Sequence, residues 1–230
     1  MHSSVVRVSP FHSIPKLGMI SSAVRAPRSH RGGRWFKSSI IHKFWSGAKA
    51  SGSNPDAPIM DLLETIKSRR SIRAFQEKEI PTEVIEQFKE ALIWAPSAGN
   101  LQSRKFYFVF NQQIKKQLAE VALNQNFIAQ APLVVVACAD ARIKTRYGQR
   151  GQEVYMICDV AASIQNLLLL VHQLGLGAVW IGAFDEVRLA QLLNCPDYLR
   201  PIAIIPVGLP AEKPSPPPRV SKEEAVELVK

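Results

Sequence analysis

Three arginines and a serine within five residues form the first group in this sequence that could do chemistry. Arg69, Arg70, Ser71 and Arg73 stand where an apolar helical pattern fades. Each guanidinium offers a planar fork of donors, so the group suits a phosphate. Cations also favour a helix C-terminus because they complement its dipole, and taken alone the cluster indicates a helix end more than a phosphate site.

A polar loop follows about 25 residues later. Residues 95–102 read APSAGNLQ, and Ser97, Asn100 and Gln102 place hydroxyl and amide groups on one short segment after Pro96. Such groups can read the polar edge of a heterocycle. The same residues are ordinary turn chemistry, and taken alone they favour a turn.

A glycine-rich stretch, GLGAVWIG, spans residues 175–182. A dinucleotide fingerprint needs a third glycine where Trp180 stands, and a strand where the pattern predicts a helix, so a Rossmann site is excluded. Gly182 ends a predicted strand. It could let a ligand approach the backbone N–H, or it could serve packing, and the sequence leaves both open.

The rest of the sequence offers no catalytic or metal-binding motif. Phosphate-loop, zinc-protease and nucleophile-elbow patterns are missing, and His172, alone among residues 56–230, is predicted to be a satisfied core residue. Cys138, Cys158 and Cys195 are odd in number and widely spaced, which argues against a disulfide framework or thiolate metal site and favours a reducing compartment. We interpret them as packing or surface residues. The chemistry is therefore expected to come from a cofactor.

Composition and charge narrow the function class. The 230 residues are 47% hydrophobic and 21% charged, which excludes a wholly disordered chain. Residues 1–55 hold nine of the 29 Lys and Arg residues and no Asp or Glu, which leaves 20 basic against 19 acidic residues in 56–230. Since the body is nearly neutral, we expect no nucleic acid partner.

The basic segment predicts two parts of the chain, a leader over 1–58 and a domain over 59–230. The first 55 residues of the leader are rich in Ser and Arg and free of acids, as organellar transit peptides are. It could equally be a flexible extension, or sequence upstream of a start at Met60. The protein is accordingly expected in the cytoplasm, or in a mitochondrion or plastid if the leader is a transit peptide.

Hydrophobic periodicity predicts one α+β or α/β domain. We expect helices from about residue 61 to 70, from 82 to before Pro96, over 112–123, 153–174 and 186–193, and a last amphipathic turn over 225–229. Strands are expected over 105–110, 133–139, 178–181 and 202–207. Polar residues such as Asp159 interrupt the apolar stripe of the central helix, so we expect a buried helix and no membrane partner.

The order of the motifs resembles the nitroreductase family. SRRSIRAF, APSAGNLQ, APLVVVACAD, DVAASIQNLLLL followed by LGLGAVWIGAF, and PVGLP with PPPR occur in succession over 60–230. The resemblance implies an α+β nitroreductase-like sandwich, with a central, mostly antiparallel sheet flanked by helices around a long buried helix. It also implies a domain-swapped-type homodimer with FMN bound at the interface.

Carried over by position, the resemblance implies a set of FMN-binding residues. The phosphate and ribityl chain would meet Arg69, Arg70, Ser71 and Arg219, and Arg73 would lie near the N1–O2 edge of the ring, where a fixed cation stabilises the charge of the reduced flavin. Pro96, Ser97 and Asn100 would come from the other subunit, on the loop that carries Gln102. Gly182 would present its N–H towards N5 with Ala183 alongside, where some relatives have an acidic residue, and residues 124–126 fall where some relatives contact the flavin.

The implied function is an FMN-dependent oxidoreductase that uses NADH or NADPH to reduce nitro-aromatics, quinones or similar small electron-poor acceptors in a ping-pong cycle. No protein catalytic residue and no metal is expected, because FMN carries the chemistry. The alternatives are a family member with another flavin reaction, such as reductive dehalogenation or flavin cleavage, and a flavin-binding protein without turnover. Those other reactions accompany lid insertions in the family, and the short interval 140–153 argues against them.

Overall fold

A computed structural model describes residues 61–230. The predictions made for the leader, residues 1–58, lie outside these residues.

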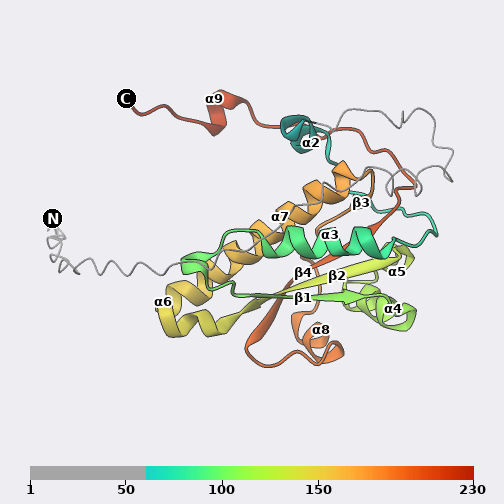
Figure 1. The fold of residues 1–230 in the computed structure, drawn as a ribbon, viewed down its shortest axis with the longest axis horizontal. Helices are drawn as coiled ribbons and strands as arrows, with labels where there is room; N and C mark the ends of the chain where they lie inside the picture. Colours follow the sequence, from blue (N-terminus) through green and yellow to red (C-terminus); the bar gives the residue numbers. More distant parts are fainter. Residues whose placement is uncertain (1–60) are drawn as a thin grey trace, which may run out of the picture. The chain divides into compact units, whose positions relative to one another are not determined.

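Four antiparallel strands form the sheet at the centre of the domain (Figure 1). They are β1 (Arg104–Val109), β2 (Leu133–Asp140), β3 (Gly177–Ala178) and β4 (Leu199–Gly208), in the order β1-β2-β4-β3. A single parallel bridge, Ser71 to Ala178, adds to its edge. β2 is buried over seven of its eight residues, as its continuous apolar run predicts. The α+β class and the mostly antiparallel sheet are confirmed.

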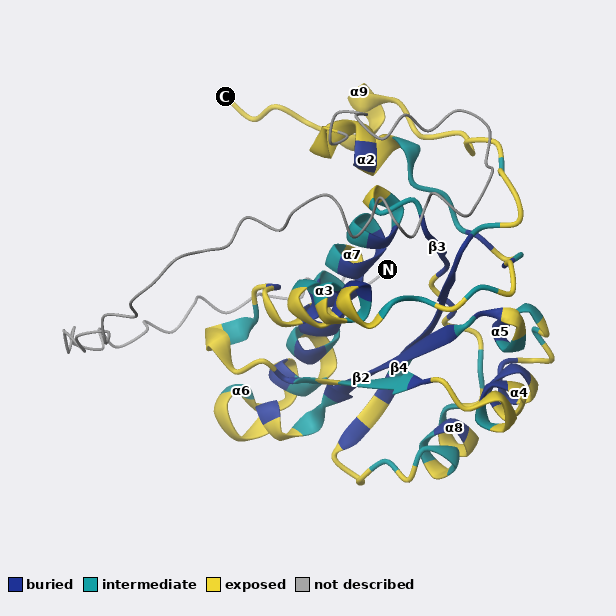
Figure 2. Ribbon diagram, turned by 45° about the vertical axis from the view of Figure 1, so that its right-hand side comes forward, coloured by how far each residue is buried: buried dark blue, intermediate teal, exposed yellow. Residues whose placement is uncertain are grey.

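Helices cover both faces of this sheet, so its interior strands face apolar side chains on each side (Figure 2). One face packs against α3 (Thr82–Ile93) and α7 (Met156–Gln173), and the other against α4 (Gln112–Val121), α5 (Phe127–Gln130) and α8 (Glu186–Leu192). Alternation along β2 divides its side chains between the layers: Val135 and Ala137 point to α7, whereas Val134, Val136 and Cys138 point to α4 and α8. The remaining helices are α2 (Leu62–Ser68), α6 (Lys144–Arg150) and α9 (Lys222–Ala225), with short 3-10 turns at Ala98–Asn100 and Ala141–Ile143.

The central helix α7 follows a π-helical turn, Gly151–Tyr155, and its predicted apolar stripe is buried: Val160, Ile164, Leu167, Leu168 and Val171. By length and composition, the continuous helical segment Ala141–Gln173 could cross a membrane, since an 18-residue window within it has a mean hydropathy of 1.8. The polar residues in this helix are therefore not enough to exclude a membrane span. The stronger argument is that the apolar stripe of α7 packs against the sheet and α3. The helix ends at Gly175, whose φ of +71° permits the N–H groups of Gly175 and Leu176 to bond back to His172 and Val171, both at 2.9 Å.

Two predicted elements differ from the structure. The strand expected over 178–181 has only the two residues of β3, and Ile181 pairs separately with Ile204. Continuing the register places Val179 opposite Pro206, which has no N–H to give, so the ladder is interrupted there. The turn expected over 225–229 is wrong: α9 begins earlier because the Ser221 hydroxyl accepts from the N–H of Glu224 at 3.0 Å, as a helix N-cap does.

Candidate active site

The arginine cluster lies where α2 leaves its helical path and joins the edge of the sheet. The N–H of Arg69 still bonds to Thr65 O at 3.1 Å, and the backbone then turns to extended geometry. Ile72 donates to Ala178 O at 3.1 Å, and Gln76 donates to Leu209 O at 2.9 Å. These bonds fix Arg69, Arg70 and Ser71 beside the end of β3.

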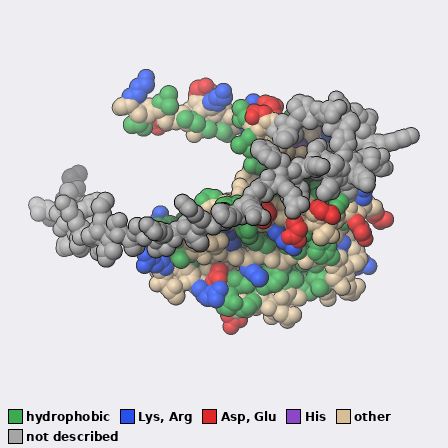
Figure 3. Space-filling model, viewed as in Figure 1, with side chains coloured by type: hydrophobic (Ala, Val, Ile, Leu, Met, Phe, Trp, Pro, Cys, Tyr) green, Lys and Arg blue, Asp and Glu red, His purple; other side chains and the backbone are tan. Residues whose placement is uncertain are grey.

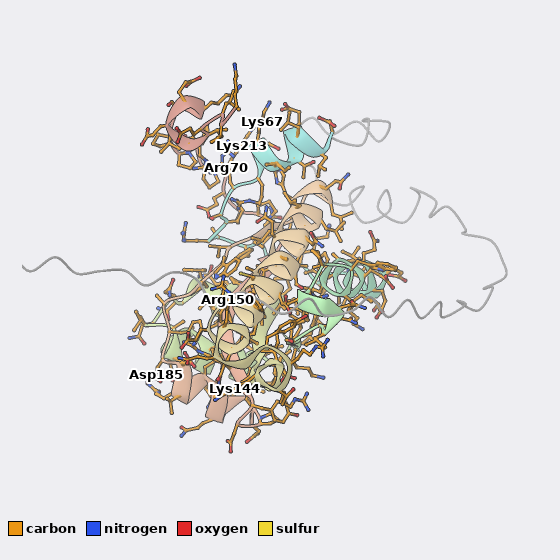
Figure 4. The ribbon with its side chains drawn as sticks, turned by 90° about the vertical axis from the view of Figure 1, so that its left-hand side faces the viewer. Lys67, Arg70, Lys144, Arg150, Asp185 and Lys213 are labelled. Atoms are coloured by element: carbon orange, nitrogen blue, oxygen red, sulfur yellow. The ribbon has the colours of Figure 1, made fainter. Side chains whose placement is uncertain are left out.

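The chain after β4 returns to the same place from the other end of the sequence. Ala211 donates to Ala74 O at 2.9 Å, and the Glu212 carboxylate accepts from the backbone N–H groups of Arg73 and Ala74. Figure 4 shows Lys213 at the end of the molecule that carries Lys67 and Arg70. Glu212 thus holds the exposed Arg73 segment in place, a role that the sequence analysis missed.

Arg69, Arg70 and Arg219 converge electrostatically. Burial lowers the pKa of Arg69, and repulsion from Arg219 and then Arg70 lowers it further. Within residues 61–230 none of the three forms an ion pair with Asp or Glu. Arg70 instead donates to Lys67 O and Arg69 O, at 2.6 and 2.8 Å, and Arg219 to Pro218 O at 3.2 Å. Three neighbouring guanidinium groups without an acidic partner fit a multiply charged anion such as a phosphate.

His172 lies beside this arginine cluster, so the prediction that it is a core residue is wrong. It is half-buried at the end of α7, and its Nε2 lies 2.8 Å from the Ser68 hydroxyl. Burial lowers the pKa of His172, and the charges of Arg69 and Arg70 lower it further. The side chain of His172 has a hydrogen-bond partner, as predicted. It lies near the arginines because α7 ends at the edge of the sheet, one residue after His172.

Gly182 is exposed, and packing against the described residues does not explain why a glycine stands at this position. Among residues 61–230, a Cβ at Gly182 would meet no heavy atom within 4 Å, and the backbone of Gly182 is not left-handed. By contrast, a Cβ at Gly177 would lie 2.6 Å from Cγ1 of Ile72. Of the two interpretations left open by the sequence, close approach of a ligand or of another chain fits Gly182 better.

The exposed Gly182 and Ala183 have polar neighbours from the α4–α5 connection. Gln125 Nε2 donates to Ala183 O at 3.3 Å, which brings residues 124–126 against this segment. The two residues before Gln125, Leu123 and Asn124, both have positive φ, +59° and +60°. The structure thus assembles two of the groups that the family resemblance had placed near the flavin ring.

The polar loop, residues 96–102, is held in an unusual backbone conformation. Asn100 and Gln102 have φ of +56° and +52°, and the Ser97 hydroxyl accepts from the N–H of Gln102 at 3.0 Å. Pro96, Asn100 and Gln102 are exposed and Ser97 is half-buried. Two strained, exposed polar residues in one short loop point to a binding role more than to a simple turn.

Arg104 and Asp159 support this loop, and the sequence analysis assigned neither a role. The Arg104 guanidinium donates to the carbonyls of Ala95, Ile93 and Pro96 at 2.7, 2.9 and 3.1 Å. Ile93 is the last residue of α3, and the other two follow it. Asp159, buried in α7, accepts from the N–H of Ala98 at 2.9 Å. The sequence did contain a signal for the role of Asp159, because an acidic residue stands there within an apolar helical stripe.

Within one chain, the loop and the arginine cluster lie at opposite ends of α7. Asp159 binds the loop and His172 contacts the cluster, and 13 helical residues correspond to about 20 Å. Figure 1 shows α7 running from α6 to α2. A site that uses both groups closely therefore needs a second copy of the chain, in keeping with the loop being expected from the other subunit.

Comparison with known proteins gives the family. The sequence model of the nitroreductase family matches residues 66–141 and 113–209. A putative NADH dehydrogenase/NAD(P)H nitroreductase of Methanothermobacter thermautotrophicus is 35% identical over 159 residues, which cover 67% of this chain and 80% of the relative. An FMN reductase [NAD(P)H] of Bacillus subtilis is 29% identical over 71% of both chains.

Solved structures agree with this family and with the fold. The NADPH:FMN oxidoreductase from Vibrio harveyi complexed with NAD+ superimposes with a TM-score of 0.69 at 26% identity, over 74% of this chain and 78% of that one. The chain therefore belongs to the nitroreductase family, a class of NAD(P)H-dependent oxidoreductases, as its motif order indicated.

Proposed function

We propose that this protein is an FMN-dependent oxidoreductase that uses NADH or NADPH to reduce small electron-poor acceptors such as nitro-aromatics and quinones. Membership of the nitroreductase family and relatives named as NAD(P)H nitroreductases and FMN reductases support FMN and NAD(P)H. The observation that carries the proposal is that Arg69, Arg70 and Arg219 lie near one another and form no ion pair with an acidic residue of the described part, 61–230.

The residues of this chain fit the parts of FMN. Arg69, Arg70 and Arg219 would hold the phosphate, with Ser71 beside them, and the open Gly182 would give the ring access to a backbone N–H. Arg73 is exposed and Glu212 accepts from its backbone N–H, so the segment that would carry this positive charge to the ring edge is held in place. When bound, FMN supplies the transfer of electrons from NAD(P)H to the acceptor. We expect a ping-pong order, in which the nicotinamide nucleotide leaves before the acceptor enters.

A homodimer would complete the site, with Pro96, Ser97, Asn100 and Gln102 supplied by the partner subunit. Large apolar side chains are exposed on α2 and near the polar loop, which supports an apolar interface: Leu62, Leu63, Ile66, Ile93, Trp94 and Leu101. Light scattering of the purified chain should give twice the mass of one subunit. A monomer that nevertheless binds FMN and turns over would contradict the shared site.

Purification of the full chain tests the function directly. We expect a yellow protein whose flavin absorbance bleaches anaerobically on addition of NADH or NADPH and returns with a quinone or nitro-aromatic. Initial rates at several acceptor concentrations should give parallel double-reciprocal lines. A colourless protein that cannot take up FMN would remove the proposal, and a flavin that no nicotinamide reduces would leave only a binding protein.

Two variants test the phosphate assignment. A charge-assisted hydrogen bond is worth about 1.5–3 kcal/mol, so Arg69→Ala and Arg219→Ala should each weaken FMN binding by about 10- to 100-fold. Without FMN, Arg219→Ala should not destabilise the chain, because it removes a charge that repels Arg69. Arg188→Ala, exposed on α8 beyond the sheet, is the matched control. If both variants hold FMN as firmly as the control does, the assignment is wrong.

A further inference from the structure

Two cysteines that are distant in the sequence meet on the face of the sheet that α4 and α8 cover. Cys138 points to this face from β2 and has no exposed surface, and Cys195 packs against the same apolar cluster from the connection between α8 and β4. Both thiols are free. The nitroreductase site uses neither residue.

The end of α8 fixes the backbone of Cys195. Asn194 has a φ of +49°, and the N–H groups of Asn194 and Cys195 bond back to Gln191 O at 3.1 Å and Ala190 O at 2.8 Å. This is the paired-bond arrangement that commonly ends a helix, and Pro196 follows it. Cys195 is therefore held against the sheet by the helix end and not by its own side chain.

The side chain of Cys195 has two protonated neighbours. They are the thiol of Cys138 and the hydroxyl of Tyr107 on β1, which lies beside β2. Burial, followed by the contact with Cys195, raises the pKa of Tyr107 to about 12, and burial is also the main cause that raises the pKa of Cys138. At neutral pH both neighbours of Cys195 therefore keep their protons.

Only one sulfur of the pair is accessible to a reagent from outside. Cys195 is partly exposed and lines a surface groove of about 920 Å³ together with Gln152, Met156, Ala190 and Asp197. Cys138 lies behind it. A small oxidant would thus reach Cys195 first, and the only thiol in contact with the product would be Cys138.

We propose that Cys195 and Cys138 form a peroxide-reactive dithiol that closes into an intramolecular disulfide. The Cys195 sulfur attacks one oxygen of a hydroperoxide, the O–O bond breaks, and a sulfenic acid and water or an alcohol are formed. Cys138 then attacks the sulfenic sulfur, the S–O bond breaks, and the oxygen leaves as water with the Cys138 proton. In total, two thiols lose two electrons and two protons and the peroxide gains them.

The two side chains are already neighbours in one packed cluster, and bond formation would draw the sulfurs to about 2.05 Å. The Tyr107 hydroxyl lies beside the attacking sulfur. The bond would tie the end of α8 to the central strand β2.

Thiol counting on the full chain tests the proposal. After brief treatment with hydrogen peroxide, quenching and denaturation, alkylation should find one free thiol in place of three, and mass spectrometry should find a peptide that joins Cys138 to Cys195. Cys158→Ser should fall from two thiols to none at the same rate. Cys195→Ser should keep both of its thiols at that dose, and Cys138→Ala should stop at a sulfenic acid that dimedone traps on Cys195.

Near-ultraviolet circular dichroism establishes that each variant is folded, and Tyr107→Phe gives a milder perturbation. It should slow the loss of thiols several-fold and still yield the same cross-link. The proposal is overturned if the exposed Cys158 reacts while Cys138 and Cys195 remain alkylatable, or if Cys195→Ser loses thiols as fast as the parent.

Discussion

Replacing Arg104 with alanine should loosen the polar loop and lower the stability of the whole domain. The side chain joins the end of α3 to the start of β1 through three carbonyl acceptors, at 2.7, 2.9 and 3.1 Å. Burial lowers the pKa of Arg104, and the charge of Asp159, which lies beside it, only partly offsets this effect. Asp159 Oδ2 is buried and has no hydrogen-bond partner within residues 61–230, so the carboxylate would lose its nearby cation.

The expected cost is about 3 kcal/mol. A hydrogen bond to a charged group contributes about 1.5–3 kcal/mol, which for three bonds would give well above this figure. Arg104 is half-exposed, however, and water can reach part of the carbonyls once the side chain is gone, which reduces the loss. For a domain of this size the midpoint of thermal unfolding should fall by about 6–12 °C.

Thermal and urea unfolding of the FMN-free protein measure this loss, and FMN titration measures its effect on the site. Arg104→Lys keeps the charge but lacks the planar fork, so it should recover only part of the stability. Lys105→Ala, exposed on the same strand, should change the free energy of unfolding by less than about 0.5 kcal/mol. FMN affinity should fall in Arg104→Ala, because the loop that carries Ser97 and Asn100 is no longer fixed.

A midpoint for Arg104→Ala within 1–2 °C of Lys105→Ala would refute the reasoning, since it would mean that water replaces the guanidinium without cost. If Arg104→Ala has normal stability but binds FMN weakly, Arg104 contacts FMN directly and does not act by supporting the polar loop.

Three further outcomes follow from the site. Gly182→Val should unfold at the parent temperature in the FMN-free monomer but impair FMN binding or turnover, because a Cβ at this position meets no heavy atom of residues 61–230 within 4 Å. Gly177→Ala should lower the free energy of unfolding by about 1–3 kcal/mol, since its Cβ would lie 2.6 Å from Ile72, and thermal unfolding compares the two. Since the pKa of His172 is lower in the folded chain than its ordinary 6.5, the unfolded chain binds more protons just below that pH. Stability measured in urea should therefore fall as the pH drops below about 6.5, and His172→Gln should flatten that slope; an unchanged slope would contradict the pKa direction.

Most of the positive net charge of the chain comes from its first 55 residues. The structure shows how the charged residues of the remaining part are distributed. Figure 3 shows Lys, Arg, Asp and Glu interspersed over the visible face of the described part. The cations that matter for the site are therefore distinguished by position and by the lack of acidic partners, and not by number. That distinction cannot be read from composition.

Much of the fold could be predicted because its signals are local. The buried run at 133–139, the apolar stripe of α7 and Pro96 after α3 each act within one element, and each agrees with the structure. Predictions failed where an element depends on a distant segment. The strand expected over 178–181 is short because Pro206 lies opposite Val179. His172 belongs to the cations because Ser68 and Arg69 lie at the end of its helix.

By itself, the amino-acid order determined the family, the α+β class and the residue types available for an anion and a heterocycle. Only the tertiary structure decided which of them meet. Arg219 and Arg69 are 150 residues apart and become neighbours because residues 71–76 and 209–212 pair beside β3. Cys138 and Cys195 meet because α8 ends against the sheet, and Gly182 is open because no side chain of the described chain reaches it. Contacts between distant segments depend on how sheets and helices pack, and no spacing along the chain records that.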